Sequence, residues 1–419
     1  MKKIIFAILI TGLIAAAALL SCSDRGNPVE SLPYYPGGVV FNAVNQHFVR
    51  HLDYQMFGQN SIYFQIYVPY GYSDTESPQR FYPMLLMLTP FRGDEYFYFN
   101  HGLKDLADKM IATGEIKPMI IVCISGATDF GGCFYGDNWA GGKYAETIGN
   151  INNPKRWTDS AGTMLDYFIG ILRDYEEEGN IHGYRSTRAV SGIGMGGYGA
   201  MRVALRYSEN FSSVSAVSAP LDFDGAAGTG GFIPLFHDLM TEVGAANYAA
   251  MDIDNAKPLQ SMFFAAASAF SPHDTGYIET VIADGVINDP ATWFNSFALS
   301  ANASVHLPFG PDGEVSAVPW SLWRENNIPT ILADYSGALD SLNIFLMHSN
   351  GWDGYSFNEQ TKDFRDLLRN TYGKIPGTPS FDTLSYNGLP GYDSDANIYV
   401  WDILPHILKY HSDKFVIPQ

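Results

Sequence analysis

Two uninterrupted apolar runs of strand length stand out in the first half of the chain. They are YPMLLMLTP at 82–90 and PMIIVCISG at 118–126. A strand without polar alternation is buried on both faces, which is typical of a parallel sheet covered by helices. The stretch SIYFQIYVP at 61–69 alternates between apolar and polar residues and ends at a proline, so it predicts a further strand.

Apolar residues at helical spacing separate these strands from the next ones. We expect helices at 101–113 and at 161–178, each between two strand signals. The remaining predicted elements are, in chain order, a strand at 188–191, a helix to about residue 207, a strand at 214–220, a strand at 342–349, a helix at 360–372, a strand at 381–386 and a final helix from about residue 400.

Alternation of strands with helices predicts an α/β fold, with a doubly wound, mostly parallel sheet. The alternation stops at about 221–323, a stretch with few charges that is rich in Ala, Gly and Phe, as in SMFFAAASAF at 261–270. We interpret this stretch as a large insertion packed over the C-terminal edge of the sheet.

The N-terminus begins MKKIIFAILITGLIAAAALLSC. Two lysines, an apolar run and a small residue before a cleavage point predict a secretory signal peptide at 1–21. The alternative is a transmembrane anchor that stays attached, because Ile4–Leu20 lies at the short end of the roughly 17–25 residues that span a bilayer.

Leu-Leu-Ser-Cys at 19–22 resembles a bacterial lipobox. The resemblance implies that Cys22 is acylated, that 22–35 is a lipidated tether and that 36–419 is the folded domain with its insertion. The protein would then be exported and lipid-anchored to the bacterial cell envelope, on its periplasmic or cell-surface face.

Charge excludes one large class of partners. The chain has 25 basic and 44 acidic residues, and loss of Lys2 and Lys3 with the signal peptide leaves 23 basic residues and a formal charge of −21. No run rich in lysine or arginine is present, so we expect no nucleic-acid partner. Anionic lipid would repel the mature chain, which leaves the acyl chains at Cys22 as its membrane contact.

Two cysteines, Cys123 and Cys133, remain after Cys22. They either pair as a disulfide in an exported protein or stay as two separate thiols. The sequence has no Cys-x-x-Cys and no His-x-x-x-His, so it predicts neither a metal site nor a cofactor.

The stretch AVSGIGMGGYGA at 189–200 follows the Gly-x-Ser-x-Gly pattern of a nucleophile elbow, the sharp strand-to-helix turn of serine hydrolases. The nucleophile position, however, is Gly194. The alternative is that this stretch is only a glycine-rich turn that never formed an active site.

The longer segment at 188–223 is very similar to the elbow, helix and following strand of the putative-esterase family of α/β-hydrolases. This family includes feruloyl esterases, formylglutathione hydrolases and mycolyltransferases. Supporting stretches are FRGDE at 91–95, GGCFYGDN at 131–138, AFSPH at 269–273 and LPFG at 307–310. The last two resemble a subgroup of exported bacterial esterases. The resemblance implies the α/β-hydrolase fold and a serine–histidine–acid triad.

The triad is degenerate when this chain is compared with that pattern. Gly194 has no side chain to attack an acyl carbon, and Ser191 is a weak substitute because it precedes the turn. Asp353, a few residues after the predicted strand at 342–349, matches the position of the acid; alternatively, it only forms a turn before Gly354.

No histidine occupies the expected position of the catalytic base. The family places it after the last strand, where this chain has Tyr392 or Asp395 instead. We expect His406 and His411 to be surface or packing residues of the terminal helix. His348 lies on the acid side of the site rather than the base side.

The oxyanion loop differs as well. The family has His-Gly after the first buried strand, whereas this chain has Thr89-Pro90. The backbone N–H groups of Phe91 and Met195 still form a potential pair of donors for an anion or a carbonyl.

Polar and aromatic residues near the pocket suggest binding. Phe134, Tyr135, Asn138 and Trp139 are candidates to contact a sugar or an acyl group, and the alternative is that they pack the insertion against the sheet. The sequence thus predicts an inactive esterase-type fold that binds a glycan or an acylated ligand. The alternatives are an active ester hydrolase or acyltransferase with displaced catalytic residues, and a structural lipoprotein without a small-molecule site.

Overall fold

The computed structural model describes residues 39–44, 63–70, 82–127, 131–136, 184–225, 230–251, 256–273, 296–300, 303–349, 355–386 and 396–417. The predicted signal peptide and the whole of the tether at 22–35 lie outside these residues, as does the helix expected at 161–178.

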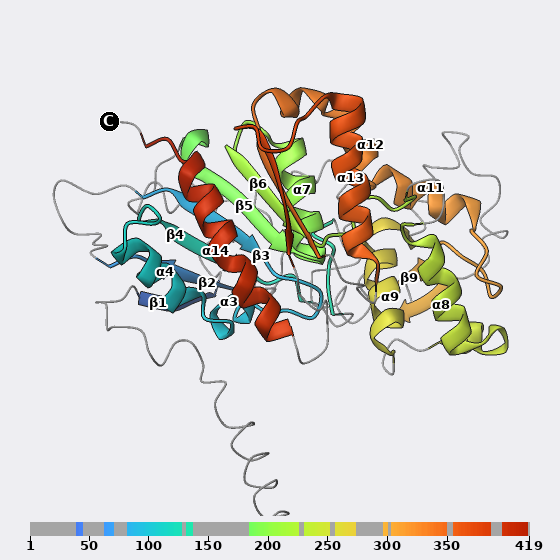
Figure 1. Ribbon diagram of the computed structural model, residues 1–419. Coiled ribbons are helices and arrows are strands. Elements are labelled where there is room, and N and C mark those ends of the chain that lie inside the picture. The colour runs from blue at the N-terminus through green and yellow to red at the C-terminus, as the bar shows by residue number, and fades with distance from the viewer. Residues whose placement is uncertain are drawn as a thin grey trace, which may run out of the picture.

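An eight-stranded mixed sheet forms the centre of the molecule (Figure 1). Its strands are β1 (Val39–Val44), β2 (Tyr63–Val68), β3 (Met84–Leu88), β4 (Ile120–Ile124), β5 (Arg188–Ile193), β6 (Ser213–Val217), β10 (Asn343–Ser349) and β11 (Phe381–Tyr386). They are arranged in the order β1-β2-β4-β3-β5-β6-β10-β11. The strands from β4 to β11 in this order are parallel, and β2 runs antiparallel to both β4 and β1. The prediction of a doubly wound, mostly parallel sheet is therefore confirmed.

The two apolar runs form the centre of the sheet, where strands are covered on both faces. Every residue of β3 and of β4 is buried. Along β3, Leu86 and Leu88 join one hydrophobic core, whereas Leu85 and Met87 join the other. The uninterrupted apolar pattern thus reflects two cores, one on each face of the sheet.

Helices cover both faces. The first face is covered by α3 (Phe97–Asn100), α4 (Leu103–Ala112) and α14 (Ala396–Lys414), and Figure 1 shows α14 running across the strands on this side. The second face is covered by α7 (Met195–Arg206), α12 (Ile328–Asp334) and α13 (Phe357–Tyr372). Within the described residues, no helix combines the length and apolarity needed to cross a bilayer.

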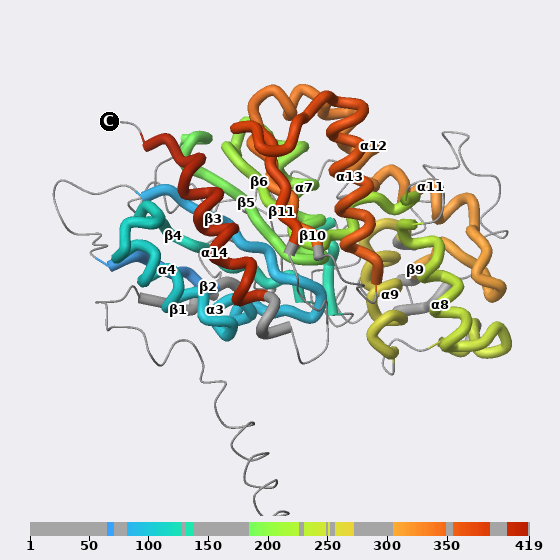
Figure 2. Tube along the Cα trace, in the orientation of Figure 1, coloured from blue at the N-terminus to red at the C-terminus, as the bar shows by residue number. Residues whose placement is uncertain are grey.

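The stretch at about 221–323, which we interpret as an insertion, contains helices and a second, smaller sheet. It holds α8 (Ile233–Val243), α9 (Pro258–Phe270), α11 (Ala317–Glu325) and a small antiparallel sheet in the order β7 (Pro272–His273), β9 (Ala303–His306), β8 (Ser296–Ser300). Figure 2 shows α8, α9, α11 and β9 gathered at one end of the large sheet, beside α13. Short 3₁₀ helices lie at Arg185–Thr187, Ala245–Ala250 and Ser336–Asp340.

Aromatic rings join this stretch to the large sheet. Phe223, which follows β6, lies 5.5 Å from the ring of Tyr198 on α7 and 5.4 Å from that of Phe270 on α9, measured between ring centroids. The ring of Trp323 on α11 lies 5.4 Å from Phe270. The Trp323 indole also donates a hydrogen bond to the Ser271 hydroxyl at 2.9 Å. The two parts therefore share one continuous core.

Candidate functional site

The turn between β5 and α7 has the backbone of a nucleophile elbow. Gly194, at the tip, has φ 54° and ψ −121°, and its N–H donates to the Val217 carbonyl at 2.8 Å. A Cβ on Gly192 would come within 2.2 Å of the Gly196 backbone, and one on Gly196 within 2.1 Å of the Leu88 carbonyl oxygen. These glycines are required for the close approach of strand and helix. The elbow is thus built completely, but its tip carries no side chain.

Ser191 is the nearest serine along the chain, and it points away from the elbow. It is fully buried on the α14 face of the sheet, where its hydroxyl accepts a hydrogen bond from the Ser215 hydroxyl at 2.7 Å. Ser215 also lies 2.9 Å from Nε2 of His411, whose Nδ1 lies 2.8 Å from the Ser213 hydroxyl. No local sequence pattern indicates that His411 contacts Ser213 and Ser215.

The directions of these hydrogen bonds assign a structural role to His411. Because Ser215 gives its proton to Ser191, Nε2 of His411 donates to Ser215, and Nδ1 accepts from Ser213. Burial lowers the pKa of His411 to about 3, so the ring is neutral. A neutral, fully enclosed imidazole with both nitrogens occupied is not poised to activate a nucleophile; it fixes α14 to β5 and β6. His406, by contrast, is exposed on α14.

The two predicted backbone donors lie in the turn after β3 and at the start of α7. Among the described residues, neither the N–H of Phe91 nor that of Met195 has a hydrogen-bond partner. Met195 begins α7, so its N–H lies at the positive end of a 12-residue helix. The Phe91 N–H belongs to a turn closed by a 2.9 Å hydrogen bond from the Gly93 N–H to the Pro90 carbonyl.

Thr89, at the position where the family has histidine, connects the loops after β3 and β4 at this edge of the sheet. Its fully buried hydroxyl donates to the Gly93 carbonyl at 2.9 Å and accepts from the Gly126 N–H at 2.9 Å. The Tyr135 hydroxyl in turn donates to the Thr89 carbonyl at 3.0 Å. The side chain therefore fixes the loops after β3 and β4 together, a role that only the contacts reveal.

Phe134 and Tyr135, two of the predicted ligand contacts, lie in the core. This position agrees with the alternative in which they are packing residues. They are 0% and 3% exposed. Tyr135 packs so closely on Gly126 and Gly199 that a Cβ at either position would come within about 2.6 Å of it. Ligand binding by these two residues stays a prediction. Asn138 and Trp139 lie outside the described residues.

The strands that precede the acid and base positions are in place. β10 ends at Ser349, shortly before Asp353, and β11 ends at Tyr386, before Tyr392 and Asp395. These three candidates lie outside the described residues, so their roles stay predictions.

His348 lies at the end of β10 and is 5% exposed. Its side chain is on the same face as Ile344 and Leu346, whose core includes the buried residues of α13. Burial and the positive charges of Arg365 and Lys362 lower the pKa of His348 to about 4. The ring is therefore directed at α13.

Left-handed backbone is concentrated after the carboxyl ends of the strands. Among the described residues, those other than glycine with positive φ are Arg92, Phe134, Tyr135, Ser218 and Ser356. They follow β3, β4, β6 and β10, and Gly194 adds the turn after β5. Such residues cost on the order of 1–3 kcal/mol each and cluster at functional sites.

The two cysteines lie on opposite sides of the sheet. Cys123 on β4 belongs to the core beneath α14, whereas Cys133 packs against the other core, and both are free thiols. Within the described residues, no group of three or more His, Cys, Asp or Glu side chains is placed to hold a metal ion.

Comparison with known proteins identifies relatives of this arrangement. The family model described as "Putative esterase" matches residues 57–273. Two curated relatives, "Esterase MT1326" and "Esterase Rv1288" from two strains of Mycobacterium tuberculosis, are each 23% identical over 232 residues. The aligned region covers 53% of this chain but 43% of each relative, so the chain spans less than half the length of these esterases.

Two solved structures, an esterase and a hydrolase, align over 90% of the chain. A ferulic acid esterase is 16% identical, covers 90% of this chain and 100% of its own, and gives a TM-score of 0.49. The S-formylglutathione hydrolase FrmB from Staphylococcus aureus is 12% identical, covers 90% and 98%, and gives a TM-score of 0.46.

Proposed function

We propose that this chain, which belongs to the putative-esterase family, is an exported lipoprotein that binds a glycan or an acylated ligand at the elbow without hydrolysing it. The observation that carries the proposal is Gly194: the elbow backbone is complete, and the nucleophile is missing from it. Loss of the serine or the histidine of a triad typically lowers turnover by on the order of 10⁶.

Binding is supported by what the elbow retains. The N–H groups of Phe91 and Met195 can donate to a carbonyl or carboxyl oxygen, and the dipole of α7 favours the same partial charge. Residues with left-handed backbone around this edge of the sheet lower the stability of the fold. A binding site at this edge would account for their presence there. Ligands bind at the carboxyl ends of the strands in sheets of this type.

The first experiment measures hydrolysis of p-nitrophenyl acetate by the purified mature protein against a heat-denatured control. We expect no turnover above that control. Gly194→Ser should not restore activity, because Ser191 and His411 are enclosed and no histidine follows β11 before the terminal helix. Turnover that is lost on Asp353→Ala would instead establish an active enzyme with displaced residues.

The second experiment tests binding through the backbone donors. Proline is tolerated at the first position of a helix and lacks the N–H, so Met195→Pro removes one donor. Met195→Leu is the matched control that keeps it. We expect an acetylated oligosaccharide to bind the wild type and Met195→Leu, with affinity for Met195→Pro lowered about tenfold, since a hydrogen bond contributes roughly 1 kcal/mol or more. Equal affinity of the two variants would contradict a role for this donor.

A further inference from the structure

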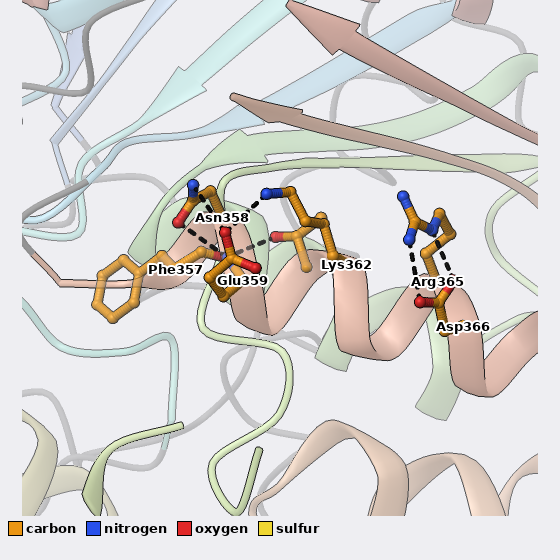
Figure 3. A network of polar contacts seen from close by, with 7 residues as sticks. Phe357, Asn358, Glu359, Lys362, Arg365 and Asp366 are labelled. Carbon is orange, nitrogen blue, oxygen red and sulfur yellow. Dashed lines mark hydrogen bonds and ion pairs between the residues drawn. The ribbon is translucent and has the colours of Figure 1, made fainter. Parts of the chain in front are cut away.

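The flank of α13 that faces β10 and β11 carries two cations close to a buried imidazole. Lys362 and Arg365 are one turn apart on the same side of the helix, and Figure 3 shows their charged groups on the side where the strands lie. Their side chains are 23% and 26% exposed. His348 at the end of β10 completes the group.

Each cation holds a carboxylate that lies further out. Lys362 is 2.6 Å from Glu359, and Arg365 makes two hydrogen bonds to Asp366, at 2.8 and 3.0 Å. The two acidic side chains are 55% and 47% exposed, about twice as much as the cations. The acids thus form the outer rim, and the positive charges lie nearer the sheet.

The imidazole has an unused hydrogen-bonding atom in this environment. Nδ1 of His348 is buried and has no hydrogen-bond partner among the described residues. Leaving such an atom unpaired is costly, typically by about 1–3 kcal/mol. In the register of β10 with β11, His348 lies beside Ser385, an exposed residue whose hydroxyl is on the same face.

We propose that His348, Lys362 and Arg365 form an anion-binding subsite that takes a carboxylate or sulfate group. The imidazole offers a hydrogen-bond donor, and the two cations offer charge-assisted hydrogen bonds, the strong type for oxyanions. Charges that face His348 are Arg365 and Lys362, which lower its pKa, and Glu359 and Asp366, which raise it by less. The field at the ring is therefore positive in spite of the two acids.

The position of the subsite indicates what kind of ligand would use it. β10 is separated from β5 by β6 alone, and strands are spaced about 4.8 Å apart, so the subsite lies roughly 10 Å from the elbow across the sheet. A glycan bearing a uronate or sulfate group one or two sugars from its acyl group spans that distance. This identification of an anionic glycan rests on the proposed function; the anion site itself does not.

The test follows the imidazole of His348 in the full mature chain by NMR, with the resonance assigned from its loss in His348→Gln. Inorganic sulfate and D-glucuronate are the probes, D-glucose is the neutral control, and chloride keeps the ionic strength constant. We expect both anions to raise the pKa of His348 by about one unit or more, because a nearby negative charge favours the protonated ring. A pKa that does not move in either anion would overturn the proposal.

Variants identify the cations responsible. Lys362→Met and Arg365→Met should each weaken sulfate binding about tenfold, in keeping with loss of a charged hydrogen bond. The matched control is Lys409→Met, which breaks a comparable helical ion pair, with Asp413 on α14, and should bind sulfate like the wild type. Unchanged sulfate affinity in both α13 variants, with native circular dichroism, would contradict the proposal. Because sulfate has no acyl group, failure here leaves binding at the elbow standing.

Discussion

Gly194 occupies the tip of the elbow, where the backbone conformation disfavours any side chain. Its φ of 54° is one that glycine adopts freely, whereas a side chain there costs roughly 1–2 kcal/mol. An active enzyme accepts that cost because serine performs the chemistry. Glycine at 194 avoids that cost and offers no nucleophile, whereas Arg92, with a φ of 64° in the loop after β3, bears a cost of the same kind.

At the residue scale, Thr89 provides a test of how the edge is held together. Thr89→Val keeps the shape of the side chain but removes the hydroxyl that bonds Gly93 and Gly126. The buried N–H of Gly126 then loses its partner, and we expect the free energy of unfolding to fall by about 1–3 kcal/mol. Urea denaturation followed by circular dichroism measures the change.

Thr89→Ser is the control for this prediction, because it keeps the hydroxyl and loses a methyl group. It should retain most of the stability and, at the elbow, the affinity of the wild type. If Thr89→Val and Thr89→Ser unfold at the same urea concentration, the hydroxyl does not hold the loops.

At the scale of elements, α14 is attached to the sheet through a histidine that must stay neutral. The pKa of His411 is about 3 in the folded protein against 6.5 for the unperturbed side chain. Between these values the unfolded chain binds a proton that the folded chain does not. Stability contributed by the neutral ring is therefore complete above about pH 6.5 and is lost progressively as the pH falls toward 3. We expect the free energy of unfolding to decrease over this range.

His411→Gln tests the assignment, since glutamine can hydrogen-bond Ser213 and Ser215 but does not titrate. Denaturation curves at a series of pH values between 4 and 8 should be flatter for the variant than for the wild type. A smaller slope should remain, because the pKa of His348 is also low, about 4. A variant with the wild-type pH dependence would show that His411 is not the titrating group.

Elements differ in how far local pattern could predict them. β3 and β4 were predicted because two buried faces leave a continuous apolar run. β1 was missed, since its place at the sheet edge depends on pairing with β2. α9 was missed as a helix because it is buried almost all round, which removes the periodicity that marks an amphipathic helix.

The candidate site shows the same division. Gly194 and Met195 follow from a local motif, and the structure places them at the elbow, whereas Phe91 follows from the resemblance and lies in the turn after β3. The contacts of Thr89 with Tyr135 and of Ser215 with His411 join residues 46 and 196 positions apart. No local pattern encodes such pairs; only the folded chain brings them together.

At the scale of the whole molecule, the shared aromatic core predicts that the large sheet and the insertion unfold together. Trp323 is fully buried and contacts Phe223, Phe270 and Phe236. Trp323→Ala should lower the free energy of unfolding by about 3–5 kcal/mol. Tryptophan fluorescence and far-ultraviolet circular dichroism should give coincident transitions in the wild type. Two separate transitions would mean that the insertion is an independent unit.

The proposed lipid anchor leads to a prediction about how the whole molecule attaches to a membrane. If the expected signal peptide is removed, the mature chain has a formal charge of −21 and anionic lipid repels it. We therefore expect attachment to depend on acyl chains at Cys22. Cys22→Ser removes the thiol that we propose is acylated, and we expect loss of metabolic labelling by an alkyne fatty acid together with a shift of the protein from the membrane to the soluble fraction. Cys133→Ser, which leaves Cys22 intact, is the matched control and should stay labelled and membrane-bound. A Cys22→Ser protein that remains in the membrane at high salt would contradict acylation and support the alternative, a retained N-terminal anchor, because a hydrophobic segment holds without charge or lipid.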